Sequence, residues 1–205
     1  VRNLYNLDYI HRSRNNLEFK RAVGMAAAER IHDGETLMIN AGVTTSAVAS
    51  ILKSKRNLSI VTNSLTVAME LGTVQTFRVI LLGGNINVQY AFTYGSDALE
   101  ALEHYRADHA ILSIDGIKAD AGLTTYHAEE ATLDRAMMRR VCATIVVADY
   151  TKIGHESFAS VSALNRSIEL ITNECANKEQ IADIATKCSG VYLCNDEGGL
   201  ARYTG

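Results

Sequence analysis

The sequence contains no proline and no tryptophan, and its four cysteines form no Cys-x-x-Cys pair. Without proline, turns must rely on Gly, Asn and Asp, and no slow X-Pro isomerisation limits folding. Three of the cysteines lie in or beside runs of Val, Ile or Leu, so we expect buried, reduced thiols of a cytoplasmic protein instead of disulfides or zinc ligands. The cysteines are Cys142, Cys175, Cys188 and Cys194.

The chain also lacks long apolar runs and an excess of basic residues. No stretch approaches the roughly 20 apolar residues of a membrane span, and no signal-peptide pattern opens the sequence, so we expect no membrane partner. The net charge of −3 argues against a nucleic-acid surface on this segment, because neutralising phosphates requires a basic face. The six histidines show no ligand spacing such as His-x-x-x-His, so neither a metal nor another cofactor is predicted.

What is present fits one large α/β domain. With 205 residues, of which 47% are hydrophobic, the chain can bury a full core. Residues 1–16 are polar and rich in Arg and Asn, and we expect them to be the end of an interdomain linker. The folded domain is then expected over residues 17–205.

Strand-like and helical patterns alternate along the domain. Strands of an open parallel sheet are typically separated by helical stretches of about ten residues, which predicts an α/β fold with a mostly parallel sheet and helices on both faces. Asn16 is expected to cap the first helix, and the segment 83–95 is expected to be a loop long enough to act as a lid. The predicted helices are 17–31, 44–53, 64–71, 96–104, 129–139 and 178–185, and the predicted strands are 37–39, 58–61, 77–82, 109–114, 144–148, 168–171 and 190–193.

A short polar loop follows each of five predicted strands. In an open parallel sheet the carboxyl ends of the strands share one edge, so these loops are expected to converge on one crevice, where α/β folds bind small molecules. They offer backbone N–H groups, hydroxyls, an amide, a carboxylate and an ammonium, which suits a hydroxylated and phosphorylated ligand. The loops are Asn40–Thr45, Thr62–Ser64, Gly83–Asn85, Asp115–Gly116 and Asp149–Lys152.

The first loop carries the strongest signal for an anion. Gly42 lets the backbone approach a ligand closely, Thr44 or Thr45 can cap the next helix, and the N–H groups and dipole of that helix attract negative charge. Asp115 can bind sugar hydroxyls or act as a general base, and Lys152 is the only Lys or Arg within the five loops. The complete set of candidate binding residues is Asn40, Gly42, Val43, Thr44, Thr45, Thr62, Asn63, Ser64, Gly83, Gly84, Asp115, Gly116, Glu129 and Lys152.

Each of these residues also has a purely structural interpretation. Threonine, serine and asparagine after a strand often do no more than cap a helix, and Gly83-Gly84 can be only a flexible turn. Glu129 opens a predicted helix, where acidic residues are favoured by the helix dipole alone. Lys152 can equally be a solvated surface lysine.

Taken in order, the motifs resemble the C-terminal effector-binding domain of DeoR-type bacterial regulators of sugar metabolism. Each motif is weak alone, but the ordered series over about residues 17–175 is specific. The matching stretches are Asp33–Thr36, Ala41–Thr45, Ile60–Ser64, Leu81–Gly84, Asp115–Ile117, Gly122–Thr125, Glu129–Ala131, Ala148–Gly154 and Leu170–Asn173.

The resemblance implies a fold similar to ribose-phosphate isomerase and the sugar-phosphate deaminases. It also implies an N-terminal winged helix-turn-helix domain that is absent from this chain. The DNA operator would be bound only through that domain. In the family, a sugar phosphate or related metabolite binds the sensor domain and alters operator binding. We therefore expect a ligand-sensing domain of a transcriptional regulator, most simply of a repressor. We also expect a homo-oligomer, because helix-turn-helix repressors commonly read two half-sites. The apolar positions 191–193 are a candidate for the contact between copies.

The sequence departs from the family pattern at four positions. The family usually has Asp at the position of Asn40, a third Thr at Val43, a basic residue at Asn87 and a lysine at Asp134. Each change removes positive charge or alters polarity near the expected pocket.

The alternative is an enzyme, a sugar-phosphate isomerase or deaminase, because the same fold supports that chemistry and fold does not decide function. The isomerases carry a denser acidic cluster after their Asp-Gly and a Lys-Gly-Gly loop. Here Asp115-Gly116 is followed by Ile117-Lys118-Ala119, and Lys-Gly-Gly does not occur. We therefore predict a sensor that is not an enzyme and assign no catalytic residues.

Overall fold

The computed structural model describes residues 15–205, so only Asn15 and Asn16 of the expected linker lie within the described part. Its helices are α2 (Leu17–Glu29), α3 (Val43–Leu52), α4 (Leu65–Leu71), α5 (Ser96–Glu103), α6 (Ala128–Met138) and α7 (Lys178–Ala185), with a 3₁₀ turn η1 (Tyr150–Lys152). Its strands are β1 (Thr36–Ile39), β2 (Ser59–Thr62), β3 (Arg78–Leu81), β4 (Asn85–Asn87), β5 (Phe92–Tyr94), β6 (Ala107–Ser113), β7 (Gly116–Lys118), β8 (Gly122–Thr125), β9 (Val141–Val147), β10 (Ala159–Ser162), β11 (Ile168–Asn173), β12 (Gly190–Cys194) and β13 (Leu200–Arg202).

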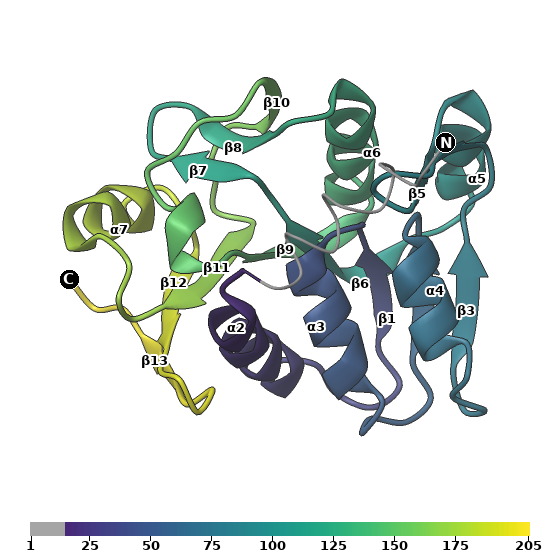
Figure 1. Cartoon of the computed structure of the whole chain (residues 1–205), viewed down its shortest axis with the longest axis horizontal. Helices are drawn as coiled ribbons and strands as arrows, with labels where there is room; N and C mark the ends of the chain where they lie inside the picture. The colour runs from purple at the N-terminus through teal and green to yellow at the C-terminus, as the bar shows by residue number, and fades with distance from the viewer. Residues whose placement is uncertain (1–14) are drawn as a thin grey trace, which may run out of the picture.

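An eight-stranded sheet forms the centre of the molecule, in the order β13-β12-β11-β9-β6-β1-β2-β3 (Figure 1). Neighbouring strands are parallel except β12 and β13, which are antiparallel. Helices α2, α3 and α4 pack on one face, whereas α5, α6 and α7 pack on the other. The predicted α/β fold with a mostly parallel sheet is therefore confirmed.

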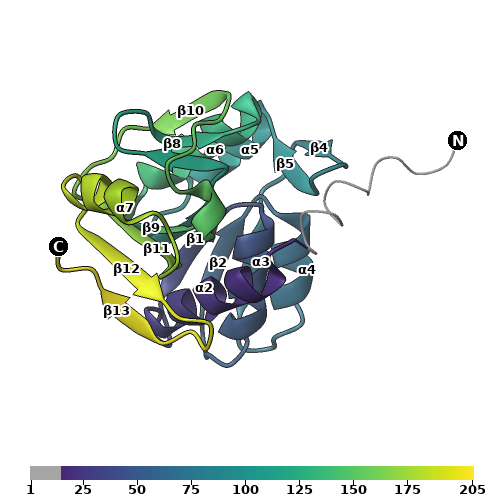
Figure 2. The same cartoon turned by 60° about the vertical axis from the view of Figure 1, so that its left-hand side comes forward.

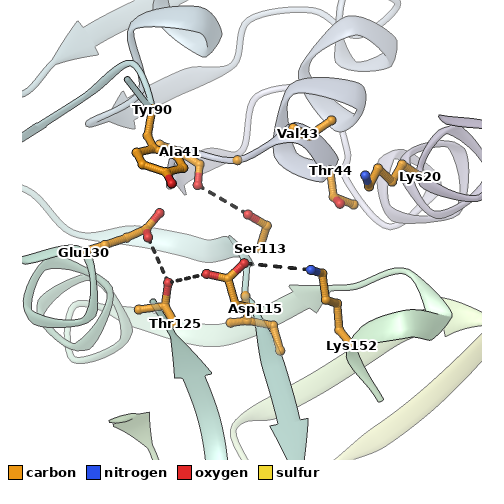
Figure 3. Close-up of a pocket in the computed structure, with 12 residues that line it drawn as sticks. Lys20, Ala41, Val43, Thr44, Tyr90, Ser113, Asp115, Thr125, Glu130 and Lys152 are labelled. Atoms are coloured by element: carbon orange, nitrogen blue, oxygen red, sulfur yellow. Dashed lines mark hydrogen bonds and ion pairs between the residues drawn. The ribbon is translucent and has the colours of Figure 1, made fainter. Parts of the chain in front are cut away.

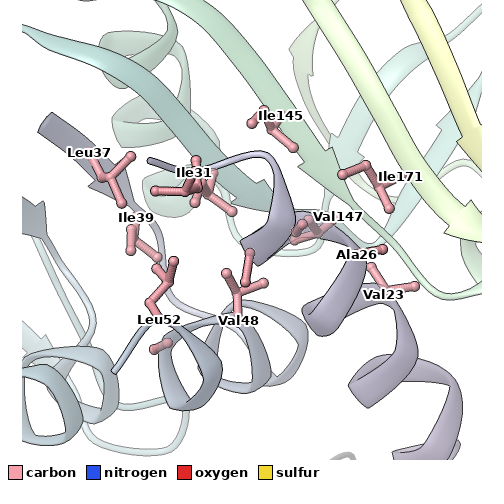
Figure 4. Packing of buried hydrophobic residues seen from close by; sticks show 14 of the residues in the cluster. Val23, Ala26, Ile31, Leu37, Ile39, Val48, Leu52, Ile145, Val147 and Ile171 are labelled. Atoms are coloured by element: carbon pink, nitrogen blue, oxygen red, sulfur yellow. The ribbon is translucent and has the colours of Figure 1, made fainter. Parts of the chain in front are cut away.

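The core follows from the period of two along each strand. Leu37 and Ile39 of β1 point to the face covered by α2 and α3, where they pack with Val48 and Leu52 of α3 (Figure 4). Met38 between them points to the opposite face and packs with α5 and α6. Because both faces are covered, the central strands carry continuous apolar runs such as Leu37–Ile39 and Ile145–Val147, and these runs made the strands recognisable in the sequence.

Two small antiparallel sheets were not predicted. Strands β7, β8 and β10 form a three-stranded sheet beside the carboxyl edge of the main sheet, and β4 pairs with β5 where a loop was expected (Figure 2). These strands have only three or four residues, too few for an apolar alternation to be recognised in the sequence. The segment 83–95 is thus a hairpin, not an irregular lid loop.

The expected helix caps are correct in one of three places. Ser64 caps α4, because its hydroxyl accepts a hydrogen bond from the N–H of Val67 at 3.2 Å. Asn16 makes no capping hydrogen bond and lies instead in a left-handed conformation with φ of 56°. Thr45 does not cap α3; its hydroxyl oxygen lies 3.0 Å from the carbonyl oxygen of Asn40 and 3.1 Å from that of Gly42, and it donates its single proton to one of them.

The expected burial of the cysteines is half right. All four are free thiols, and burial raises the pKa of Cys188 and Cys194 to about 11, which keeps these two protonated. Cys142 and Cys175 are exposed, because they lie at the ends of the apolar runs and not within them. Among residues 15–205, no helix is long and apolar enough to cross a membrane.

The segment proposed for self-association belongs to the core. Val191 is buried and Leu193 is partly buried against the same cluster, within a strand that lies between β11 and β13. The apolar character of residues 191–193 is therefore explained by packing inside the domain.

Candidate functional site

A pocket of about 50 Å³ opens at the carboxyl ends of β1 and β6 (Figure 3). Segments far apart in the sequence meet there: the start of α2, the loop before α3, the end of β6, the β4–β5 hairpin, β8, α6 and η1. This is the edge at which an open parallel sheet is expected to bind small molecules. The lining residues are Lys20, Ala41, Gly42, Val43, Thr44, Tyr90, Ser113, Ile114, Asp115, Thr125, Glu130 and Lys152.

The N-terminal turn of α3 forms one wall of the pocket. The helix starts at Val43, and the N–H groups of a first turn have no partner within their own helix and favour an anion. Gly42 makes this wall possible, because a Cβ atom there would lie 1.9 Å from the hydroxyl oxygen of Ser113. Only glycine therefore lets β6 and the α3 turn approach this closely.

Two ammonium groups flank the α3 turn. The Nζ atom of Lys152, from η1, lies 3.9 Å from Oδ1 of Asp115. Lys20 reaches the pocket from the first turn of α2 beside Thr44, and only 7% of its surface is exposed. Its Nζ atom lies 4.0 Å from Oδ2 of Asp149, a carboxylate that is almost completely buried. The α3 turn and these two lysines make one side of the pocket suited to negative charge.

The other side of the pocket carries hydrogen-bonding oxygens. Asp115 accepts hydrogen bonds from the hydroxyl group of Thr125 at 3.1 Å and from the N–H of Tyr126 at 3.0 Å. The hydroxyl oxygen of Thr125 also lies 2.8 Å from Oε2 of Glu130. A hydroxyl group has a single proton, so Thr125 can donate to only one of these carboxyl groups at a time. This arrangement of acceptors matches the hydroxyl groups of a polyol.

The hairpin β4–β5 contributes an aromatic residue to the same side. Tyr90, in the turn of the hairpin, points toward the part of the pocket that carries Glu130 (Figure 3). Its ring packs edge-on against His127, with 4.5 Å between the ring centroids. The hairpin is thus placed against the start of α6, and Tyr90 encloses the pocket from above.

A buried polar pair lies behind the pocket wall. The side-chain amide of Asn40 donates to both carboxyl oxygens of Asp134, at 3.0 and 3.1 Å, and also to the carbonyl of Ser113 at 2.9 Å. Asp134 is completely buried, and its pKa is raised well above the ordinary value by burial and by the nearby charge of Glu130. Two of the departures from the family pattern therefore contact each other directly and fix the end of β6.

Five of the predicted binding residues line the pocket, namely Gly42, Val43, Thr44, Asp115 and Lys152. The others lie outside its lining. Asn40 and Thr45 are buried and bonded to neighbouring backbone or to Asp134. These other residues are Asn40, Thr45, Thr62, Asn63, Ser64, Gly83, Gly84, Gly116 and Glu129.

The second and third predicted loops hold the β4–β5 hairpin. The side-chain amide of Asn63 donates to the carbonyl of Thr93 at 3.2 Å, and the hydroxyl of Thr62 donates to the carbonyl of Ile39 at 2.6 Å. Gly84 has a φ of 111° and passes so close to β5 that a Cβ atom would lie 2.6 Å from the carbonyl oxygen of Tyr94. These loops position the hairpin, and through it Tyr90, instead of facing the pocket.

Sequence patterns missed several lining residues. Ala41, Ser113 and Ile114 adjoin predicted loops, and Tyr90 lies in the segment expected to cover the crevice. Thr125 lies within the Gly122–Thr125 motif, and Glu130 is next to Glu129, which was predicted to bind the ligand. Lys20 carried no local signal, because it lies on a helix with no strand directly before it. The residues missed are Lys20, Ala41, Tyr90, Ser113, Ile114, Thr125 and Glu130.

Within the part of the chain that the structure describes, no group of three or more His, Cys, Asp or Glu side chains is arranged to hold a metal ion. The carboxylates of the pocket are instead bonded to a hydroxyl, a backbone N–H and a lysine. The chemistry that these residues offer is the recognition of hydroxyl groups and of an anion.

Curated proteins similar to this chain include transcriptional repressors. The HTH-type transcriptional repressor GlcR of Bacillus subtilis is 32% identical over 193 residues, which cover 93% of this chain and 73% of that protein. The glycerol-3-phosphate regulon repressor of Escherichia coli is 32% identical over 160 residues. That match covers 78% of this chain and 64% of the repressor, so the chain spans less than two thirds of the latter protein.

Among solved structures, ribose 5-phosphate isomerase A of Methanocaldococcus jannaschii is similar in fold, with a TM-score of 0.50 and 14% sequence identity. The likeness covers 67% of this chain and 55% of the isomerase, and it concerns the fold alone. The family profile described as the DeoR C terminal sensor domain matches residues 15–174, which is most of the chain. This chain therefore belongs to the family of DeoR C-terminal sensor domains.

Proposed function

We propose that this chain is the ligand-sensing domain of a cytoplasmic transcriptional repressor of sugar metabolism, and that its effector is a sugar phosphate or a related phosphorylated metabolite. The observation that carries the proposal is the two-sided chemistry of the pocket. Lys20, Lys152 and the first turn of α3 gather on one side, and the carboxyl groups of Asp115 and Glu130 lie on the other.

Each side suits one part of such a ligand. The helix N-terminus and the two ammonium groups can bind a phosphate through charge-assisted hydrogen bonds. The carboxylates, with Thr125 and Tyr90, can bind several sugar hydroxyls, which act as donors and acceptors. The relative from Escherichia coli is named for glycerol 3-phosphate, itself a phosphorylated polyol, which supports this class of ligand.

The same pocket gives weaker support for catalysis. Isomerisation requires a base that is free to take a proton from the substrate and an acid or cation opposite to it. Asp115, the best placed carboxylate, already accepts bonds from Thr125 and from the N–H of Tyr126, and lies beside Lys152. Both curated relatives are named as repressors, so we propose that the domain holds its ligand without transforming it.

We propose further that DNA is bound through a helix-turn-helix domain outside this chain, as the name of the Bacillus subtilis relative suggests. The chain itself carries a net charge of −3, which disfavours direct contact with phosphates of DNA. We also propose that the domain forms a homo-oligomer, because two operator half-sites are commonly read by two copies of a repressor.

Replacement of Lys152 by methionine tests the anion side of the pocket. We expect the variant to bind a phosphorylated effector more weakly by about 1.5–3 kcal/mol, the range for a hydrogen bond to a charged group. The effector is found first by a thermal-shift screen of pentose, hexose and glycerol phosphates, and calorimetry then compares it with its unphosphorylated parent. Binding of the parent should change far less.

A matched control for the Lys152 variant is Lys118→Met, which removes an exposed lysine paired with Asp120 at 3.1 Å outside the pocket. This control changes the net charge equally and should leave the affinity for the effector unchanged. Equal losses for the phosphorylated and the parent compound in Lys152→Met would show that Lys152 does not bind the phosphate.

Incubation of the chain with pentose and hexose phosphates separates the sensor from the enzyme. We expect no isomerisation and no release of ammonia above background when the reactions are followed by NMR. Turnover that is present in the unaltered chain and lost in Asp115→Asn would make the protein an enzyme and overturn the sensing proposal.

A further inference from the structure

Lys20 differs from the other lining residues because it lies at the place where the chain enters the domain. It is in the first turn of α2, four residues after Asn16, whose left-handed conformation turns the chain sharply into the helix. Only 7% of the residue is exposed, and a buried ammonium group is costly unless it is paired and hydrogen-bonded, so the neighbours of Lys20 indicate its role.

The ammonium of Lys20 joins the pocket to the segment before the helix. Its Nζ atom donates to the carbonyl oxygen of Asn15 at 2.7 Å and lies 4.0 Å from the carboxylate of Asp149. The same side chain lines the pocket next to Thr44 (Figure 3). One charged group thus contacts the backbone ahead of α2, a buried carboxylate and the space for the ligand.

Asp149 connects Lys20 to the second ammonium of the pocket. Its Oδ1 atom accepts hydrogen bonds from the N–H of Thr151, at 3.0 Å, and from the hydroxyl group of Thr151, and so caps η1. Lys152 is the last residue of η1. The position of each lysine therefore depends on the same buried carboxylate.

Two further contacts fasten the first turn of α2 to η1. The side chain of Asn173 bridges them, donating to the carbonyl of Phe19 and accepting from the N–H of Tyr150, each at 3.1 Å. The rings of Phe19 and Tyr150 pack edge-on with 4.9 Å between their centroids. The start of α2 and η1 consequently form one junction, with a pocket lysine on each half.

We propose that Lys20 is an effector-binding residue that couples occupancy of the pocket to the chain segment entering α2. This inference rests on the proposed function, because it requires an anion in the pocket. An anion between Lys20 and Lys152 attracts both halves of the junction, and a lysine has three donors, so the bond to Asn15 is retained while the junction tightens. Because coupling is reciprocal, a partner that fixes the segment before α2 must in turn change the affinity for the anion.

Inorganic phosphate is the probe for the test, with chloride at equal ionic strength as the reference. We expect phosphate to slow hydrogen–deuterium exchange of the backbone amides at the start of α2, including that of Lys20, which donates to the carbonyl of Asn16 at 3.0 Å. Lys20→Met should weaken phosphate binding by about tenfold or more, as expected for the loss of a bond to a charged group. It should also remove the slowing of exchange.

Two variants keep the test decisive. Lys20→Met leaves the carboxylate of Asp149 buried without a cation, which can prevent folding. The double variant Lys20→Met with Asp149→Asn removes both charges and keeps a side-chain oxygen that caps η1. It should be as stable as the unaltered chain but still show neither tight phosphate binding nor slowed exchange. Lys152→Met should weaken phosphate binding, yet any phosphate forced onto it at high concentration should still slow exchange at α2.

The outcomes separate this inference from the proposed function. Suppose that phosphate binds the unaltered chain, that Lys152→Met weakens this binding, and that the Lys20 variants leave it unchanged. Lys20 is then not a ligand, so the inference fails while the proposed function stands. If the Lys20 variants bind phosphate weakly but phosphate never alters exchange at α2 in the unaltered chain, the coupling is overturned. If neither phosphate nor any sugar phosphate binds the unaltered chain, both the inference and the anion site fail.

Discussion

Gly42→Ala should weaken effector binding strongly while the domain remains folded. A Cβ atom at residue 42 would lie 1.9 Å from the hydroxyl oxygen of Ser113, which must rotate away, and its 3.0 Å contact with the Cβ atom of Ser113 still pushes the α3 turn and the end of β6 apart. This moves the N–H groups of the anion site and narrows the pocket. A hydrogen bond to a charged group contributes about 1.5–3 kcal/mol, so loss of one such bond to the anion should weaken binding by about tenfold or more, measured by calorimetry.

The chain offers a matched control and a rescue for this substitution. Gly83 also follows a strand in a predicted binding loop, but a Cβ atom there meets nothing within 4 Å, so Gly83→Ala should bind the effector normally. Adding Ser113→Gly to Gly42→Ala removes the clashing side chain and should restore part of the affinity. The unfolding free energy of Gly42→Ala should fall by about 1–3 kcal/mol, as for other overpacked sites. Normal binding by Gly42→Ala would mean that the ligand lies elsewhere.

The sequence predicted those parts of the fold that are set by burial on two faces. Strands such as β1 and β9 lie in the centre of the sheet and are covered on both sides, so their residues are apolar and end at a polar loop. Strands β7, β8 and β10 were missed because each has only three or four residues and is held by pairing with the other strands, which no local pattern encodes. Tertiary contacts decide the conformation of such segments.

The candidate site likewise contains residues that strand patterns predict and residues that depend on tertiary packing. Gly42, Thr44 and Asp115 lie at the pocket because the carboxyl ends of adjacent parallel strands must meet at one edge. Lys20 and Tyr90 come from a helix and a hairpin whose distance from the crevice is set by the packing of α2 and β4–β5. Their contribution depends on contacts between segments distant in sequence, and strand-end patterns cannot supply it.

The role of buried Asp134 is visible only in the structure, because its partner Asn40 is distant in the sequence. In the sequence it is a carboxylate in place of a lysine, and Asn40 is an amide in place of a carboxylate. In the fold the two side chains bond to each other, so an amide and a carboxyl group are paired behind the pocket wall. The two departures therefore compensate each other and leave the wall behind the pocket intact.

Asp134→Asn should remove a loss of stability that the unaltered chain suffers as pH rises. Burial and the charge of Glu130 raise the pKa of Asp134 in the folded state well above the ordinary value near 3.8. Between those two pKa values the folded state holds a proton that the unfolded state has released. The unfolding free energy then falls with increasing pH, by up to about 1.4 kcal/mol for each pH unit in that interval. Asparagine does not titrate, and its oxygen can still accept the bond from Asn40.

The difference in unfolding free energy between Asp134→Asn and the unaltered chain should therefore grow in favour of the variant from pH 4 upward, and level off above the raised pKa. Urea unfolding at a series of pH values measures this difference, and Asp183→Asn, which removes one carboxylate at an exposed position on α7, is the control for the change in net charge. Parallel stability curves for Asp134→Asn and the unaltered chain above pH 4 would mean that Asp134 is ionised in the folded state. In that case the amide of Asn40 and the charge of Arg135 would have to stabilise a buried negative charge beside Glu130, against the cost of burying an ion.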